Sequence, residues 1–430
     1  MPGLILLKNG RVIDPANGID QLLDLLIAGG RISAVAQPGS LAEQSGCLVY
    51  DLAGKWVVPG LIDMHVHLRE PGQEDKETIA TGTRAAAAGG FTAVAAMPNT
   101  NPVNDNQTVT LFILAKAAEA GFARVYPVGA ISRGSKGEHL AEFGELRQAG
   151  AVAVTDDGLP VGNSQLMRRA LEYAGNHDLL VISHAEELSL SHSGTMNHGA
   201  LATRLGLGGI PSVAEEIMVY RDLALAEFTR RPIHIAHVST KESLSLIRRA
   251  KEKGVAVTAE TAPHYFTLTE TAVDGYNTLA KMNPPLRTEA DVAAVREALR
   301  DGTLDAIATD HAPHSELDKE REFALAANGI IGLETAVPLT LRLVRENQLE
   351  ARRMVELLSV NPARILGVEG GALSVGAAAD VTVIDPEKKF IFSEESIQSK
   401  SRNSPFLGWE LQGKAVLTIM AGKITWQETL

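Results

Sequence analysis

Two histidines separated by one residue, His65 and His67, end an apolar run that begins at Val57. Side chains two positions apart in a β-strand point to the same side, so both imidazoles are expected to project from one face and to bind one metal ion. Neutral imidazole is a common ligand of zinc and similar ions. Arg69 has the same spacing and is expected to reach the same region. A chance pair on a surface strand fits less well, because this run lacks the polar alternation of such a strand.

Further potential ligands stand at the ends of other apolar runs. They are His184, His237, Asp310 and one of the adjacent pair Asp156 and Asp157. Alternation along the preceding run favours Asp157 as the inward residue of that pair. A single histidine at a strand end is more often structural, but four histidines and two carboxylates at strand ends predict a binuclear metal site.

The elements that must position these residues form a repeating pattern. With the strand before His65, eight strand-like runs alternate with helical patterns, several of which end in glycine. Continuous apolar runs are typical of strands buried on both faces, and eight strand–helix units predict a TIM-type (β/α)8 barrel. Chemistry in such barrels gathers at the carboxyl ends of the strands. The other seven runs are 91–97, 123–130, 151–155, 179–184, 233–239, 255–260 and 304–310.

Both ends of the chain are rich in short strand-like runs separated by turns, such as the Asn-Gly turn at Asn9. We expect them to combine into a small β-sandwich beside the barrel. The predicted division is 1–55 for the first part of the sandwich, 56–365 for the barrel and 366–430 for the second part.

Several histidines fit a structural reading better. Alternation places His234 on the face opposite to His237, towards the helix layer. His264 follows the seventh strand and can line the rim, but we do not expect it to bind metal. The histidines in helical or loop patterns are expected to be solvated or structural: His139, His177, His192 and His198.

Composition narrows the class of protein. The 430 residues are 45% hydrophobic and 21% charged, which is ordinary for a soluble globular protein. A net charge of −12 and 4% aromatic residues argue against a nucleic-acid partner. We expect no membrane span, because the longest apolar run is broken by glycines. A single cysteine, Cys47, and a start without signal-peptide features predict a cytoplasmic protein.

A set of motifs resembles a known family. HVHLREPG, MPNTNP, TDDG, ISHAEE, HIAHVST, TAPHY, MNPPLR, ATDHAPH and GLET occur in this order along nearly the whole chain, with NPAR at 361–364. They resemble the class I bacterial dihydroorotases of the amidohydrolase superfamily. The pair of histidines alone is typical of the whole superfamily, whereas LREPG, MPNT and DHAPH are more specific.

The resemblance implies a ligand set and a cofactor. His65, His67 and Asp310 would hold one metal ion, His184 and His237 the second, and Asp157 would bridge them. Two Zn²⁺ per chain are expected, one of which can be partly occupied, although manganese or cobalt also suits these ligands. Related hydantoinases and other dihydroorotases use a carboxylated lysine after the fourth strand as the bridge. Residues 151–158 contain no lysine, which fits the class I type.

The resemblance also implies contacts with a small-molecule substrate. The matching positions are His67, Arg69, Asn99, Asn283 and His314. A guanidinium can bind a carboxylate through two parallel hydrogen bonds, which suits Arg69 for that task. The family usually carries Pro-Phe-Gly before GLET, but this chain has Ala-Ala-Asn-Gly at 326–329. Asn328 and Gly329 are therefore the expected contacts from that loop, with the phenylalanine missing.

The implied reaction is the reversible ring closure of N-carbamoyl-L-aspartate to L-dihydroorotate, a step of pyrimidine synthesis. A hydroxide bridging the two metal ions would be the nucleophile in the hydrolytic direction, and Asp310 would be the general acid and base. One alternative is another cyclic amide hydrolase, a hydantoinase or allantoinase. The other is a non-catalytic, dihydroorotase-like scaffold of aspartate transcarbamoylase. The family suggests two protein partners: a second copy of the chain in a homodimer, and aspartate transcarbamoylase.

Overall fold

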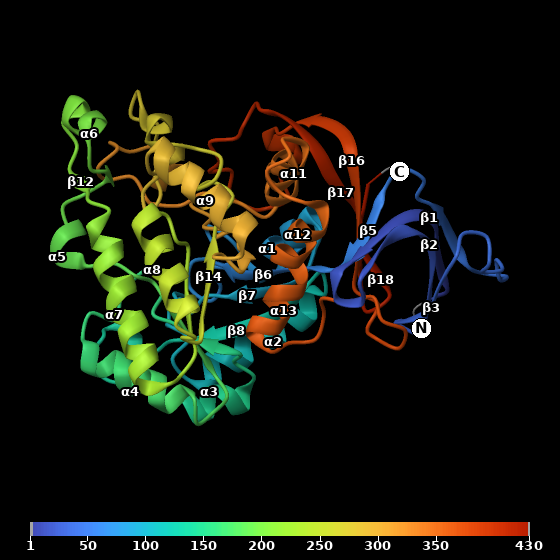
Figure 1. Ribbon diagram of the computed structural model, residues 1–430, viewed down its shortest axis with the longest axis horizontal. Coiled ribbons are helices and arrows are strands. Elements are labelled where there is room, and N and C mark those ends of the chain that lie inside the picture. The colour runs from blue at the N-terminus through green and yellow to red at the C-terminus, as the bar shows by residue number, and fades with distance from the viewer. Residues whose placement is uncertain (1–2, 429–430) are drawn as a thin grey trace.

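The computed structural model describes residues 3–428, and its larger part is an eight-stranded parallel barrel (Figure 1). The strands are hydrogen-bonded in chain order, and the bridge between Val66 and His311 joins the last strand region to the first. This arrangement confirms the predicted (β/α)8 barrel. The barrel strands are β6 (Leu61–Val66), β7 (Phe91–Ala96), β8 (Arg124–Gly129), β9 (Ala153–Val154), β10 (Leu180–Ser183), β13 (Ile233–Ile235), β14 (Val257–Thr261) and β15 (Ala306–Ile307).

Helices surround the barrel, and several of them begin and end at the residues expected for caps. The side chain of Thr78 accepts a hydrogen bond from the amide of Thr81 at the start of α1, and Gly90 ends that helix with a φ of 93°. The main helices are α1 (Ile79–Gly89), α2 (Gln107–Ala120), α3 (Phe143–Ala149), α4 (Ser164–Ala174), α7 (Val213–Thr229), α8 (Lys241–Glu252), α9 (Glu289–Asp301) and α11 (Ala336–Arg345). Shorter elements are α5 (Leu188–Ser191), β11 (Met196–Asn197), α6 (Ala200–Leu205), β12 (Gly209–Ile210), α10 (Glu316–Lys319), α12 (Ala351–Val355) and α13 (Asn361–Leu366). Within residues 3–428, no helix combines the length and the apolar composition that crossing a bilayer requires.

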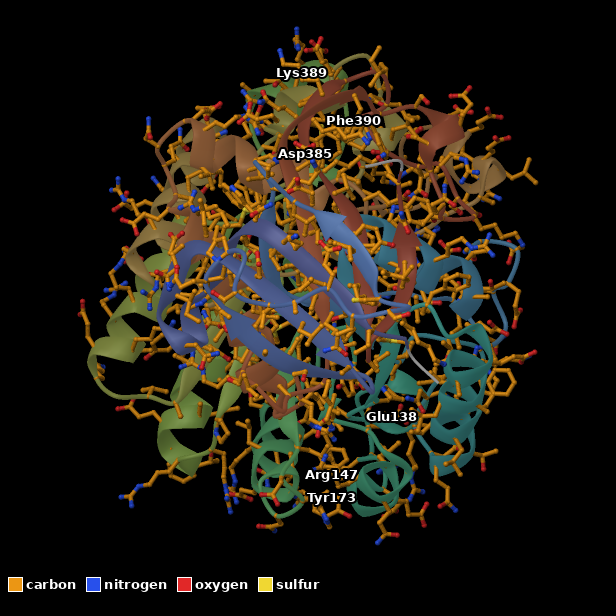
Figure 2. All side chains as sticks on the ribbon, turned by 90° about the vertical axis from the view of Figure 1, so that its right-hand side faces the viewer. Glu138, Arg147, Tyr173, Asp385, Lys389 and Phe390 are labelled. Carbon is orange, nitrogen blue, oxygen red and sulfur yellow. The ribbon has the colours of Figure 1, made fainter. Side chains whose placement is uncertain are left out.

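The two ends of the chain form a second, smaller β-unit beside the barrel (Figures 1 and 2). It has its own buried core, in which side chains from both ends meet, among them Leu25, Val383 and Ile419. This observation is consistent with the predicted β-sandwich. Its strands are β1 (Ile5–Asp14), β2 (Ile19–Ala28), β3 (Arg31–Ala36), β4 (Leu48–Asp51), β5 (Trp56–Pro59), β16 (Val381–Ile391), β17 (Glu410–Met420) and β18 (Lys423–Gln427).

The apolar run before the two histidines is not one strand. It contains β5, which pairs with β1 and β16 in the small unit, and β6, which belongs to the barrel. Gly60 separates them, and a Cβ at this position would collide with Thr92. Hydrophobicity does not distinguish the two strands, because both are buried throughout. We therefore propose Gly60, rather than residue 56, as the start of the barrel.

The segment 392–409, between β16 and β17, leaves the small unit and lies against the barrel. The hydroxyl of Ser399 donates to Glu77, which is 322 residues away in the sequence. The carbonyl of Asn403 accepts from the amide of Ile331 at 3.0 Å. The C-terminal part of the chain thus contributes to the barrel mouth as well as to the small sheet.

Candidate metal centre

The two histidines of the HVH motif lie at the carboxyl end of β6, where the pairing with β7 shifts register between Asp63 and Val66. Their ring centroids are 5.4 Å apart, and both side chains are buried. The spacing of two residues therefore places both imidazoles at one location.

Asp157 lies between two pairs of histidines. Its Oδ2 is 3.3 Å from Nε2 of His65 and 3.5 Å from Nε2 of His67. Its Oδ1 is 3.6 Å from Nδ1 of His184 and 3.4 Å from Nε2 of His237. Each pair forms, with one carboxylate oxygen, a group of three potential ligand atoms within 4.8 Å of one another. One carboxylate is thus shared by two potential metal sites.

Asp310 completes the side occupied by the first pair. Its Oδ1 lies 3.1 Å from Nε2 of His67 and 3.5 Å from Nε2 of His65. Asp310 has a φ of 49° and His237 a φ of 34°, a left-handed backbone that is uncommon outside glycine. Arg69 shares this feature, with a φ of 62°. Such backbone conformations concentrate at functional sites, where the surrounding structure holds them in place.

Buried atoms without partners indicate that this cluster is built for a metal. Nε2 of His65 and Oδ1 of Asp157 are buried and have no hydrogen-bond partner among the described residues. Buried polar atoms are normally satisfied, and these two point into the cluster. Four imidazoles with carboxylates are a donor set for zinc and similar divalent ions. The residues present therefore fit a divalent metal centre.

Further side chains orient the ligand imidazoles through their other ring nitrogens. Nδ1 of His65 lies 2.8 Å from Oε1 of Glu260, and Nδ1 of His67 lies 2.8 Å from the side-chain oxygen of Asn99. Nε2 of His184 lies 3.0 Å from Oε2 of Glu186. Partners of this kind fix ring orientation and make imidazole a stronger ligand.

The electrostatic environment keeps the two aspartates ionised. Burial alone raises the pKa of a carboxyl group, but nearby histidines outweigh this effect at both positions. His65, His184 and His237 hold the pKa of Asp157 well below its ordinary value. His65 and His67 lower the pKa of Asp310. Both residues therefore present charged oxygen ligands at neutral pH.

A cavity of about 260 Å³ opens beside this cluster. Burial lowers the pKa of Arg69 to about 10, so its guanidinium remains charged at neutral pH. Burial and the neighbouring Arg69 lower the pKa of His314 to about 2, so its imidazole is neutral. Nη2 of Arg69 lies 3.2 Å from Nε2 of His314, and Nε of Arg69 donates to the carbonyl of Pro313 at 3.1 Å. A cation and a neutral imidazole thus face the cavity together.

The structure also places the other predicted substrate residues at this cavity, except Gly329, which is not among its lining residues. Asn99, Asn283, Asn328 and His67 line it, and the amide of Asn283 donates to Glu186 at 3.1 Å. Asn328 is held through its backbone, because its carbonyl lies 2.8 Å from Nε2 of His314. Gly329 has a φ of 153°, and a Cβ there would lie 2.6 Å from the carbonyl oxygen of Ala312. The altered loop therefore requires glycine at this position.

One prediction about the histidines is wrong. His234 points into the barrel and not towards the helices: it pairs with Ile182, which lies in the barrel interior, and its Nε2 is 3.3 Å from Glu260. The left-handed backbone at His237 interrupts the alternation on which the prediction relied. Glu260 was missed, although a carboxylate inside an apolar strand is itself a signal of a buried polar contact.

Several relatives cover the chain almost completely. A family model described as "Dihydro-orotase-like" matches residues 54–243. A dihydroorotase of Desulfotalea psychrophila is 62% identical over 420 residues, covering 98% of this chain and 99% of the relative. A dihydroorotase of Syntrophotalea carbinolica is 59% identical over 423 residues, with the same coverage.

Solved structures of other cyclic amide hydrolases have the same fold. The L-hydantoinase of Arthrobacter aurescens superposes with a TM-score of 0.86 at 24% identity, covering 99% of this chain and 97% of the other. The dihydropyrimidinase of Brevibacillus agri gives a TM-score of 0.82 at 23% identity, with 99% and 95% covered. These likenesses concern the fold, whereas the full-length identities of 59% and 62% show that the chain belongs to the dihydroorotase family.

Proposed function

We propose that this protein is a zinc-dependent dihydroorotase of the class I type, which interconverts N-carbamoyl-L-aspartate and L-dihydroorotate in pyrimidine synthesis. The observation that carries the proposal is the position of Asp157, whose two oxygens face two histidine pairs beside the cationic Arg69. The high identity to dihydroorotases along the whole chain supports the same substrate.

We propose that the chain binds two Zn²⁺ ions. His65, His67 and Asp310 would hold one, His184 and His237 the other, and Asp157 both. A divalent metal in such a site supplies an activated water and polarises the amide carbonyl of the substrate. Asp157 also favours the class I type, because a lysine would stand at the bridge in a hydantoinase, and residues 151–158 contain none.

Protein side chains then account for proton transfer and substrate orientation. Asp310 would move a proton between the attacking or leaving oxygen and the ring nitrogen, for which its ionised carboxylate beside His67 is suited. The guanidinium of Arg69 would bind the substrate carboxylate, with neutral His314 and the amides of Asn99 and Asn283 as further hydrogen-bonding groups. Asn328 and Gly329 would close the cavity through their backbone.

We also propose a cytoplasmic enzyme that acts as a homodimer and associates with aspartate transcarbamoylase. The cytoplasmic assignment rests on the single cysteine. The two partners rest on the family, and size measurement of the purified protein with and without the transcarbamoylase tests them. The proposed ligands and most of the proposed substrate contacts lie together on one chain.

The deciding experiment pairs metal content with turnover. Zinc per chain is measured on the purified protein, and the opening of L-dihydroorotate is followed by ultraviolet absorbance before and after chelation. One to two zinc ions per chain with turnover that chelation abolishes would support the proposal. Metal without turnover would favour a hydantoinase or allantoinase, which a panel of hydantoin and allantoin would identify. Neither metal nor turnover after zinc addition would favour a non-catalytic scaffold.

A further inference from the structure

The segment 392–409, which connects two strands of the small unit, is anchored to the barrel mouth by two carboxylates. The carboxylate of Glu334 accepts from the backbone amides of Gln398 and Ser399 at 2.9 and 3.5 Å. The carboxylate of Glu77 accepts from the amide of Lys400 at 3.0 Å. These contacts fix the path of the segment before it reaches the substrate cavity. The position of Asn403, which follows them in the chain, is therefore defined as well.

That residue is Asn403, whose buried side chain contacts two loops at once. Its Nδ2 donates to the carbonyl of Ala312 at 2.9 Å and to the carbonyl of Gly329 at 3.0 Å. Its Oδ1 accepts from the backbone amide of His314 at 3.0 Å. One amide side chain thus connects the loop after the last barrel strand with the loop that replaces the family's Pro-Phe-Gly.

These two loops carry groups beside Arg69, the proposed ligand of the substrate carboxylate. His314 belongs to the first loop, and the carbonyl of Pro313 accepts from Arg69 at 3.1 Å. Gly329 belongs to the second, where its carbonyl also accepts from the buried Nζ of Lys319 at 3.1 Å. A shift of Asn403 would therefore move three groups together: His314, the carbonyl of Pro313 that accepts from Arg69, and Gly329.

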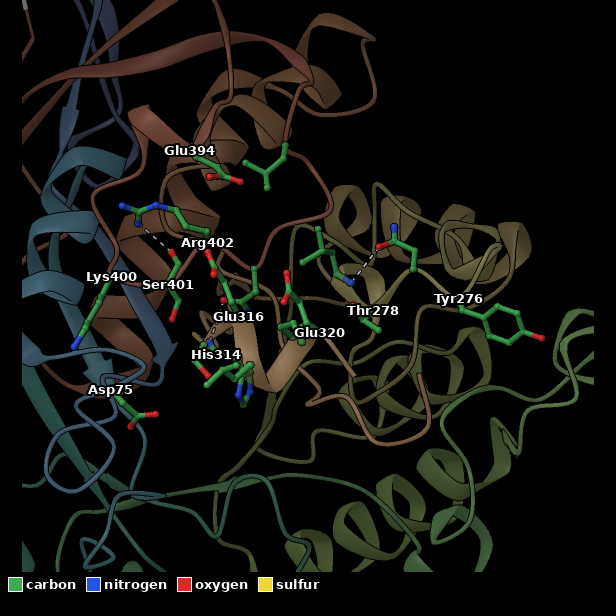
Figure 3. Close-up of a pocket in the computed structure, with 17 residues that line it drawn as sticks. Asp75, Tyr276, Thr278, His314, Glu316, Glu320, Glu394, Lys400, Ser401 and Arg402 are labelled. Atoms are coloured by element: carbon green, nitrogen blue, oxygen red, sulfur yellow. Dashed lines mark hydrogen bonds between the residues drawn. The ribbon is translucent and has the colours of Figure 1, made fainter. Parts of the chain in front are cut away.

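The ring of His314 contacts Arg69 and the carbonyl of Asn328, and its backbone amide is bound by Asn403. A cavity of about 720 Å³ lies between α10 and residues 394–403, and His314 lines it as well as the substrate cavity (Figure 3). Packed side chains would hold a loop by contact, but an open cavity leaves that task to hydrogen bonds. The bonds from Asn403 are therefore expected to contribute to the position of the two loops, together with the bonds that Gly329 makes with Lys281 and Lys319.

We propose that Asn403 is a positioning residue for recognition of the substrate carboxylate, acting from the small unit through the backbones of His314 and Gly329. The inference rests on the proposed dihydroorotase function. It assigns to the small unit a role in substrate binding, in addition to any role in stability.

The test uses the full-length, zinc-loaded protein with two substitutions and a matched control. Asn403→Asp keeps the acceptor for His314 but replaces the donor that serves two carbonyls, and Asn403→Ala removes both. Ser401→Ala is the control, because this hydroxyl lies in the same segment and donates to the carbonyl of Lys76 at 2.6 Å, with no hydrogen bond to either substrate loop among the described residues. The measurements are KM and kcat for L-dihydroorotate opening, zinc per chain and the thermal midpoint.

The expected result is a rise in KM of about tenfold or more in both Asn403 variants, from the loss of two hydrogen bonds in Asn403→Asp and of three in Asn403→Ala. Because the binding groups act on bound substrate and transition state alike, kcat should stay within about twofold, and zinc and Ser401→Ala should match the parent protein. Unchanged KM in the Asn403 variants would overturn the inference. A lower kcat at constant KM, accompanied by a loss of zinc or a lower thermal midpoint, would also overturn it, because it would indicate a structural role only. A parent protein that binds zinc but does not open L-dihydroorotate would instead refute the proposed function.

Discussion

Substitution of Asp157 by asparagine should remove one metal ion and leave the other. Each carboxylate oxygen faces a different histidine pair, at 3.3–3.5 Å on one side and 3.4–3.6 Å on the other. An asparagine side chain has one carbonyl oxygen, and its amide nitrogen does not bind zinc. One pair of histidines therefore keeps its third ligand, and the other pair loses it.

The size of the effect follows from the number of ligands. A four-ligand structural zinc site binds with about 10–16 kcal/mol, or about 3 kcal/mol for each ligand. The weakened half of the centre has three ligand atoms in the group that contains Asp157, and it loses one of them. A loss of about 3 kcal/mol corresponds to an affinity about 100-fold lower.

The assay is zinc titration against a competing chelator, followed by metal analysis of the dialysed protein. We expect about one zinc per chain in Asp157→Asn where the parent binds two. Asp156→Asn is the matched control, because Asp156 lies in the same turn but accepts from the amide of Ser132 at 2.9 Å, away from the cluster. Two zinc ions bound at the parent affinity by Asp157→Asn would refute the shared-carboxylate reasoning. An equal loss in Asp156→Asn would attribute the effect to the turn and not to the ligand.

Three further predictions address proton transfer, substrate binding and stability. Asp310→Asn should slow L-dihydroorotate opening by about 100-fold or more in a zinc-loaded sample, and full turnover with zinc retained would exclude Asp310 as the proton-transfer group. Arg69→Ala should raise KM by about 100-fold through loss of two charge-assisted hydrogen bonds, and unchanged steady-state constants would exclude the carboxylate contact. Burial raises the pKa of Glu334 to about 7. The folded protein therefore holds a proton that the unfolded chain releases at lower pH, so stability from this group is present at acid pH and is lost as pH rises through about 7. Between about pH 5 and pH 8, the thermal midpoint of the parent should therefore fall relative to that of Glu334→Gln. The exposed control Glu227→Gln should show the same pH dependence as the parent. If the thermal midpoints of Glu334→Gln and the parent change with pH in parallel, the raised pKa of Glu334 is contradicted.

The alternation of apolar runs and helical patterns along the chain was sufficient to predict the barrel. Strands covered by helices on one side and by the barrel interior on the other must be apolar throughout, so each of the eight runs is visible in the sequence. The spacing of His65 and His67 likewise brings their imidazoles together, because strand periodicity is a local property. The same periodicity did not reveal that β5 and β6 belong to different sheets, since both are buried and only Gly60 separates them.

Only the tertiary structure showed where side chains lie when the strand alternation is interrupted or when the contact comes from a distant part of the chain. The left-handed backbones at His237 and Asp310 direct side chains in ways that alternation does not describe, which is why His234 was misplaced. Asn403 is 74 residues from Gly329 in the sequence, and only the packing of the small unit against the barrel brings them into contact. The sequence alone therefore determined the fold class and the types of residue that can bind metal. Their arrangement around Asp157, and the support of the substrate loops from the other end of the chain, depend on long-range contacts that no local pattern encodes.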